Sequence, residues 1–138
     1  MKKYVLLVTI LFSFFLWTGF VSAKTDLSLS EADVTFSKEP FFAGETVRIY
    51  ARISNTADGD VVGQFAFFAN GKEIGKPQAI SIKPDTYDDV FIDWKPTAGT
   101  YNLEAKITDT LPKDEDIQNN AVIRKDIFVD TDTNKNDV

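Results

Sequence analysis

Two segments of the chain alternate apolar and polar residues with a period of two. Residues 46–54 read T-V-R-I-Y-A-R-I-S, so that every second residue from Val47 to Ile53 is apolar. Residues 101–108 read Y-N-L-E-A-K-I-T and follow the same rule. Because successive side chains of a β-strand point to opposite faces, both segments are predicted to be antiparallel strands with one buried face.

Further segments are less regular, and turn residues separate them. The aromatic run at 64–69 ends at Asn70-Gly71, after which residues 72–74 begin a partner strand. Asn-Gly favours a two-residue hairpin, because both central residues of that turn need positive φ. The remaining apolar segments are 27–29, 34–36, 88–94 and 121–129, the last with a bulge indicated at Lys125.

About seven short strands with this spacing predict an all-β fold. No convincing helical stripe follows residue 23, and Gly, Pro, Asn and Asp punctuate the chain. We therefore expect an antiparallel β-sandwich of the immunoglobulin or fibronectin III kind, which takes about 100 residues. The chain divides into a leader at 1–23, one domain at 24–129 and a polar tail at 130–138.

The leader has the three parts of a signal peptide. Lys2 and Lys3 precede an uncharged, mostly apolar stretch, and the small residues Val21 and Ala23 stand before the expected cleavage point. The alternative is an uncleaved membrane anchor, because the uncharged run approaches the roughly 20 residues that span a bilayer. Either way we expect an extracellular or cell-surface domain, with no stable membrane insertion once the leader is cleaved.

Composition narrows the chemistry of the domain. The sequence contains no Cys and no His, which excludes disulfides, thiol nucleophiles, Ser–His–Asp triads and His-ligated metals. We therefore predict that the protein is not an enzyme. Its 21 acidic residues exceed its 15 basic ones, for a net charge of −6. Loss of Lys2 and Lys3 lowers this by two more, which disfavours nucleic acid as a partner.

The run W-K-P-T-A-G-T-Y-N-L-E-A spans 94–105, and a polar acidic loop follows that ends in Asn119-Asn120. Upstream stand G-E-T-V at 44–47 and I-S-N at 53–55. In this order the motifs resemble those of the CARDB domain, the cell adhesion related domain found in bacteria, whose early strand the upstream pair resembles. One departure is Thr108, which stands where the family usually has an Asp. The resemblance implies an immunoglobulin-like sandwich in exported bacterial proteins, without catalytic residues.

The tail reads D-T-D-T-N-K-N-D-V and resembles the start of a thrombospondin type 3-like calcium repeat. Its oxygen-bearing side chains have the spacing of calcium-loop ligands. They are Asp130, Asp132, Asn134 and Asp137. However, Lys135 stands where the loop needs Gly, and no Glu closes it. We favour a polar linker, or the opening of a further region, with at most weak calcium binding and no other cofactor.

Three other groups of residues are candidates for sites. The cluster Asp109, Asp114, Glu115, Asp116 and Asn119 could hold a cation, although a solvated acidic loop is the preferred interpretation. Asp88, Asp89 and Asp93 could suggest a glycosidase pair, but nothing in the sequence raises the pKa of one of them. Aromatic residues could form a sugar platform, although most must fill the core. These are Phe65, Phe67, Phe68, Phe91 and Trp94.

Phe41 and Phe42 are the aromatic pair that we expect to be exposed, in a loop, as a contact surface. The leading hypothesis from the sequence is a secreted, non-catalytic adhesion, interaction or spacer module of a bacterial surface protein. The alternative is a carbohydrate-binding module that uses exposed aromatic rings. Under both, the partner is an unknown protein or glycan at the cell surface, and the domain is expected to be monomeric.

Overall fold

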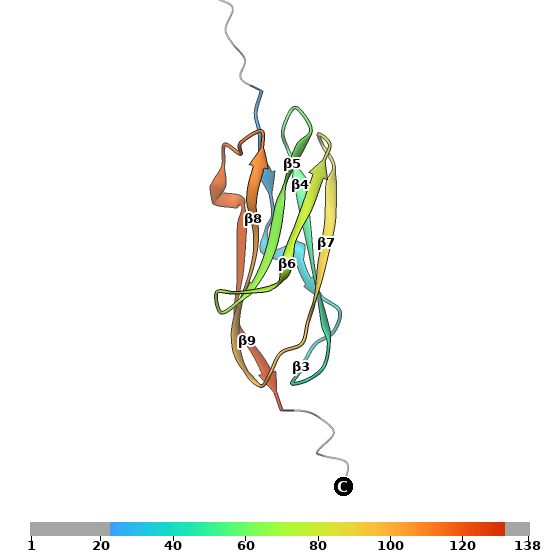
Figure 1. The fold of residues 1–138 in the computed structure, drawn as a ribbon, viewed down its shortest axis with the longest axis vertical. Coiled ribbons are helices and arrows are strands. Elements are labelled where there is room, and N and C mark those ends of the chain that lie inside the picture. Colours follow the sequence, from blue (N-terminus) through green and yellow to red (C-terminus); the bar gives the residue numbers. More distant parts are fainter. Residues whose placement is uncertain (1–22, 132–138) are drawn as a thin grey trace, which may run out of the picture.

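The alternating segment at 46–54 forms the central strand of one of two facing sheets (Figure 1). The computed structural model describes residues 23–131. The predicted leader lies outside the described residues except for Ala23, and so does the tail from Asp132 onwards. The strands are β1 (Leu27–Ser28), β2 (Val34–Phe36), β3 (Phe41–Phe42), β4 (Val47–Asn55), β5 (Val61–Ala69), β6 (Lys72–Ile82), β7 (Tyr87–Trp94), β8 (Gly99–Leu111) and β9 (Ala121–Asp130).

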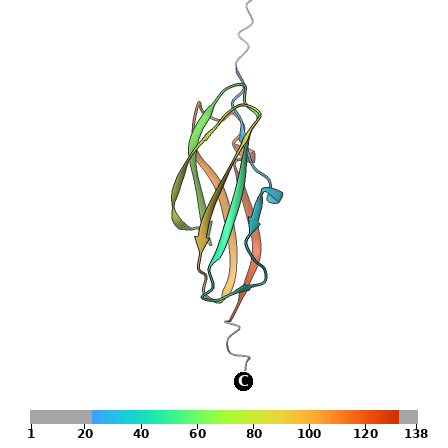
Figure 2. The same cartoon turned by 90° about the vertical axis from the view of Figure 1, so that its right-hand side faces the viewer.

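The first sheet is built around β4. This strand pairs with β7 along one edge and with β1 and β2 along the other, always antiparallel. The 3₁₀ turn η1 (Glu31–Asp33) separates β1 from β2, so the two segments form one interrupted edge. Figure 2 shows this sheet facing the viewer.

The second sheet has the order β3-β9-β8-β5-β6, in which β3 runs parallel to β9 and the other neighbours are antiparallel. A second 3₁₀ turn, η2 (Ile117–Asn119), lies in the loop between β8 and β9. The predicted all-β sandwich is confirmed. Within residues 23–131, no helix has the length and apolar character needed to cross a membrane.

The core lies between the two sheets and consists of the side chains that alternation placed on their inner faces. Its members include Val47, Ile49, Ala51 and Ile53 of β4, Phe65 and Phe67 of β5, and Leu103, Ala105 and Ile107 of β8. Trp94 is only 6 % exposed, and its ring packs edge-on against Phe41 and Tyr101. A large aromatic side chain in this position stabilises the contact between the sheets.

The predicted turn and the predicted bulge are both present. Asn70 and Gly71 have φ of 49° and 78°, as a two-residue hairpin between β5 and β6 requires. In β9, the register with β8 shifts between Arg124 and Ile127, and Asp126 has a φ of 56°. Lys125 therefore lies in a bulge, which explains its break in the alternation.

Strand β6 is longer than the sequence predicted. Residues 72–74 were expected to be a strand, yet β6 continues to Ile82 past Gly75 and Pro77. Its register with β5 shifts between Ile74 and Gln78. Gly75 and Pro77 therefore lie within a β-bulge or similar irregularity. Because β6 is at the edge of its sheet, the missing N–H of Pro77 is tolerated there.

Candidate functional site

The outer face of the first sheet carries a row of opposed polar and aromatic side chains, which we call the β4–β7 face. Its pairs are Arg48 with Asp93, Tyr50 with Phe91, and Arg52 with Asp89. Alternation along β4 and β7 turns these side chains towards solvent, because their neighbours in both strands fill the core.

Both arginines make two-pronged ion pairs across the strands. Arg48 donates from Nε to Asp93 Oδ1 at 2.8 Å and from Nη2 to Oδ2 at 3.0 Å. Arg52 donates from Nε and Nη2 to the two oxygens of Asp89, both at 2.8 Å. This fork geometry orients guanidinium and carboxylate together. The hydrogen bonds lower the pKa of Asp89 and Asp93 and raise the pKa of Arg48 and Arg52.

Aromatic rings support the same guanidinium groups. Arg48 Cζ lies 4.2 Å from the ring centroid of Phe91, and Arg52 Cζ lies 3.9 Å from that of Tyr87. The rings of Tyr50 and Phe91 are 6.2 Å apart and tilted by 52°. Each arginine is therefore held both by a carboxylate and by a ring face, which limits the number of conformations it can adopt.

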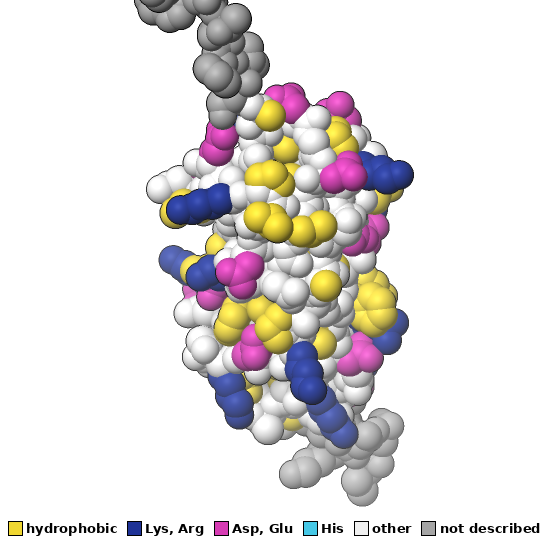
Figure 3. All heavy atoms as spheres, turned by 45° about the horizontal axis from the view of Figure 1, so that its top comes forward, with side chains coloured by type: hydrophobic (Ala, Val, Ile, Leu, Met, Phe, Trp, Pro, Cys, Tyr) yellow, Lys and Arg dark blue, Asp and Glu magenta, His cyan; other side chains and the backbone are white. Residues whose placement is uncertain are grey.

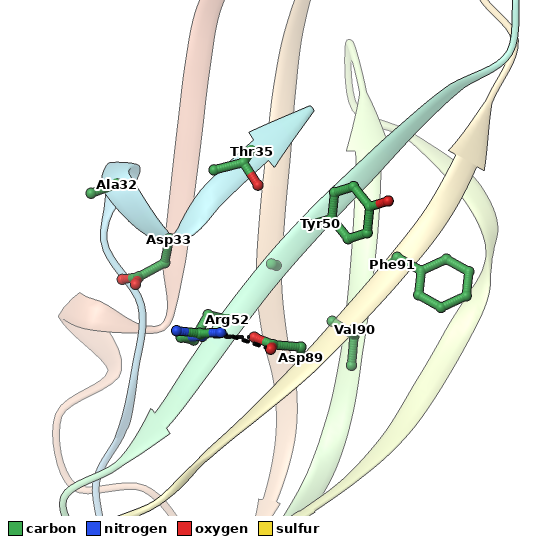
Figure 4. Close-up of a pocket in the computed structure, with 9 residues that line it drawn as sticks. Ala32, Asp33, Thr35, Tyr50, Arg52, Asp89, Val90 and Phe91 are labelled. Carbon is green, nitrogen blue, oxygen red and sulfur yellow. Dashed lines mark hydrogen bonds and ion pairs between the residues drawn. The ribbon is translucent and has the colours of Figure 1, made fainter. Parts of the chain in front are cut away.

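A shallow hollow of about 640 Å³ lies on this face between β2 and β7 (Figure 4). Ala51 and Val90 form its floor, and both are buried. Its walls carry Asp33 from η1, Thr35 from β2, Tyr50 and Arg52 from β4, and Asp89 and Phe91 from β7. The Asp33 carboxylate accepts hydrogen bonds from the backbone N–H and the hydroxyl of Ser30, both at 2.7 Å. The hollow thus combines aromatic faces with oriented donors and acceptors.

A second hollow of about 470 Å³ lies on the other sheet across β8, β5 and β6, where Val62 and Leu111 are exposed. Gly63 allows the backbones of β5 and β8 to approach here, because a Cβ at this position would collide with the carbonyl oxygen of Asp109. Figure 3 shows hydrophobic side chains on one face of the molecule as small groups between charged ones. This hollow lacks the paired polar groups of the β4–β7 face.

Hydrogen bonds hold the acidic loop before β9 in place, at the end of the sandwich opposite the polar tail. Asp114 is only 5 % exposed, and its Oδ2 and Oδ1 accept hydrogen bonds from the backbone N–H of Leu27 and Asp116, both at 2.9 Å. The interpretation of this loop as solvated is therefore wrong for Asp114. Each of its oxygens accepts a hydrogen bond from the backbone, so Asp114 holds the loop against β1.

Asp26 closes the same end of the sandwich. It accepts hydrogen bonds from Asn119 Nδ2 at 2.9 Å and Thr56 Oγ1 at 2.8 Å, and it forms an ion pair with Lys24 at 2.9 Å. Burial by itself would raise the pKa of Asp26, but these three partners outweigh it and hold the pKa below its usual value.

The aromatic candidates separate into core and surface. Phe41 lies in β3 rather than in a loop, is 7 % exposed, and packs edge-on against Phe36. The expectation that Phe41 is exposed is therefore wrong, because pairing of β3 with β9 brings it into the core. Phe42 is half-buried. Phe65, Phe67 and Trp94 are buried, so they cannot form a sugar platform.

The remaining candidates are acidic. Asp89 and Asp93 lie on the β4–β7 face, where each forms an ion pair with an arginine. Asp88 stands opposite Ile53 in the neighbouring strand and belongs to neither ion pair. Of the tail ligands, only Asp130 is described, and its Oδ1 accepts a hydrogen bond from Thr131 N at 2.7 Å. Asp132, Asn134 and Asp137 lie outside the described residues, so calcium binding there stays a prediction.

Sequence reasoning missed Tyr50, Tyr87 and the two arginines as site residues. The available signal was the polar face of 46–54, where Arg48, Tyr50 and Arg52 alternate with apolar residues. The missing information was which residues of β7 stand opposite it.

The comparison with known proteins favours one fold. The sequence matches no family model, and no curated protein matches it. The structure resembles the crystal structure of a CARDB domain from Pyrococcus furiosus, with a TM-score of 0.67, 17 % identity and coverage of 79 % of this chain and 96 % of that one. The chain has the fold of a CARDB domain. A solution NMR structure of the same Pyrococcus furiosus domain gives a TM-score of 0.59 at 18 % identity, over 79 % of this chain and 98 % of that one.

The resemblance to CARDB is thus confirmed for the fold. The Pyrococcus furiosus domain was crystallised in complex with di-metal ions. In the part of this chain that the structure describes, acidic side chains do not gather in groups of three that could hold a metal ion. Residues 23–131 therefore offer no ready-made cluster of ligands for a pair of metal ions.

Proposed function

We propose that this CARDB-like domain is a non-catalytic module of an exported bacterial surface or extracellular protein, where it acts as an adhesion and spacer element. One observation carries the proposal. The chain enters the described domain at one end of its long axis and leaves at the other (Figures 1 and 2). A module connected through such ends separates its neighbours by its whole length.

Backbone hydrogen bonds anchor both ends. The N–H of Asp58 donates to the carbonyl of Lys24 at 3.1 Å, and the N–H of Ala43 donates to the carbonyl of Asp130 at 2.8 Å. A pull along the chain is therefore transmitted to strands that run along the long axis. Because ladder hydrogen bonds are perpendicular to antiparallel strands, a pull along β9 loads its ladder with β8 in shear. This arrangement suits a domain that bears tension at a surface.

The ion pairs of the β4–β7 face support a non-catalytic role. Glycoside hydrolysis needs one carboxyl group that remains protonated near neutral pH. Arg52 and Arg48 instead lower the pKa of Asp89 and Asp93, which keeps both ionised. Export is supported by the basic start, apolar run and small residues that precede Lys24.

The location can be tested in bacteria that produce the full chain. Protease added to intact cells should degrade the domain while a cytoplasmic marker survives, and the mature protein should begin at Lys24. A Leu11→Arg variant, which interrupts the apolar run, should remain inside the cells and serve as control. Protein that resists the protease until the cells are lysed contradicts export.

The adhesion and spacer roles can be separated by replacement. Exchange of residues 24–131 for an unrelated β-sandwich of equal length should preserve the distance between the regions on either side of the domain. It should reduce the attachment of the producing cells to the surface on which they grow. If attachment is unchanged after the exchange, the adhesion role is contradicted and only the spacer role stands. Unchanged attachment after complete deletion of the domain would contradict both.

A further inference from the structure

The hollow on the β4–β7 face has the composition of a small-ligand site. We infer that it binds a neutral saccharide, with a sugar ring against Tyr50 and its hydroxyl groups on the Arg52–Asp89 pair. This inference rests on the proposed function, because it names the ligand class that an adhesion module would recognise through this face.

The charge of the face favours a neutral ligand. Arg48 and Arg52 are each neutralised by an aspartate through two hydrogen bonds. A charged partner would have to compete with these pairs, whereas a neutral one can add to them. Asp33 adds one negative charge to the hollow, where its Oδ2 accepts both hydrogen bonds from Ser30. A nucleic acid or an acidic peptide would therefore meet no uncompensated positive charge in the hollow.

The hydrogen-bonding groups that remain fit hydroxyl groups. The ion pair uses Nε and Nη2 of Arg52, and Nη1 has no partner among the described residues. Beside Nη1, each oxygen of Asp89 accepts one hydrogen bond from Arg52 and can accept at least one more. An arginine–aspartate pair therefore presents a donor next to an acceptor in fixed orientation. Adjacent sugar hydroxyls, which both donate and accept, match this pattern.

The aromatic part provides the apolar contact. Tyr50 is 39 % exposed in the middle of the face, and Phe91 supports it from the neighbouring strand. The C–H groups on one face of a sugar ring are apolar and can cover an aromatic ring of this kind. The volume of about 640 Å³ lies within the roughly 300–1,000 Å³ typical of ligand sites.

The Arg52 side chain is also oriented before binding. Arg52 is fixed on one side by Asp89 and on the other by the ring of Tyr87 at 3.9 Å. Preorganised side chains lose little conformational entropy when a ligand binds. The face therefore offers oriented groups at low entropic cost.

The test uses the mature full chain, residues 24–138, on an array of neutral oligosaccharides built from glucose, galactose, mannose, xylose and N-acetylglucosamine, followed by calorimetric titration of any hit. We expect binding with a Kd of about 1 mM or tighter. Tyr50→Ala should weaken it by about tenfold or more. Phe128→Ala, which removes an exposed ring from the other sheet, should leave the affinity unchanged.

Arg52→Lys distinguishes a saccharide from a charged partner. Lysine keeps the positive charge but loses the fork that holds Asp89. Saccharide affinity should fall in this variant and should change little with salt. The absence of any hit, binding that survives Tyr50→Ala, or binding that collapses with salt overturns the inference. So does self-association in analytical ultracentrifugation that Tyr50→Ala abolishes, because a second copy would then occupy the face.

The two proposals fail in different ways. If no oligosaccharide binds but replacement of the domain still reduces cell attachment, the saccharide inference is wrong and the adhesion module stands. If the protein is retained inside the cell, the proposed function fails whatever the array shows.

Discussion

Asp114 and Leu27 lie 87 residues apart in the chain, yet the carboxylate of one accepts a 2.9 Å hydrogen bond from the backbone N–H of the other. The contact is buried and joins the loop before the last strand to the first strand. A second bond from Asp116 N–H occupies the other oxygen of Asp114. One side chain thus closes the end of the sandwich at which the chain enters.

Removal of this carboxylate should destabilise the domain. In Asp114→Ala the buried N–H of Leu27 loses its acceptor, which costs about 1–3 kcal/mol. Urea denaturation of the mature chain measures the difference. Glu115→Ala, in the same loop but exposed, should change stability by less than about 0.5 kcal/mol. Equal losses in both variants would show that the loop, and not the hydrogen bond, determines the effect.

Trp94 should contribute strongly to the core. Trp94→Ala is expected to lower the free energy of unfolding by about 3–5 kcal/mol, because the cavity left between the sheets cannot fully collapse. Thermal unfolding followed by circular dichroism reports the loss. Phe128→Ala is the matched aromatic control and should cost less than about 1 kcal/mol, since its ring is 62 % exposed. A small effect for Trp94 would mean that the ring does not support the core.

Asp26 should make stability depend on pH at the acidic end. Its pKa in the folded protein is below the ordinary value of 3.8, so the ionised form stabilises the fold. This contribution is complete above the unfolded pKa and is lost as pH falls through the folded pKa. The stability difference between the native chain and Asp26→Asn should therefore be largest above about pH 5 and shrink towards pH 2. A difference that does not change over this range contradicts the assignment.

The tail should bind calcium only weakly in this chain. Asp130, Asp132 and Asn134 offer too few oxygens for the roughly 6–8 positions of Ca²⁺, and Lys135 opposes the cation. Calorimetric titration of residues 24–138 should give a Kd of about 1 mM or weaker. Micromolar binding that disappears in an Asp130→Ala, Asp132→Ala double variant would instead show a formed site.

The local pattern determined much of the fold. Alternation at 46–54 and 101–108 assigned inner and outer faces correctly, because the period of a strand is a property of the backbone alone. Asn70-Gly71 specified a turn through the φ values that these two residues tolerate. The apolar content of the strands then required two sheets to face each other, since each has one face to bury.

The candidate site depended on tertiary structure. Alternation places Arg52 on the outside of β4 and Asp89 on the outside of β7. These two residues are 37 positions apart in the sequence, so their pairing depends on the register between β4 and β7. A shift of two residues would keep both outside and separate them. Phe41 shows the same dependence, because its local sequence resembles a loop and only pairing with β9 buries it. Sequence thus determined which way side chains point, and the long-range packing of the sheets decided which of them meet.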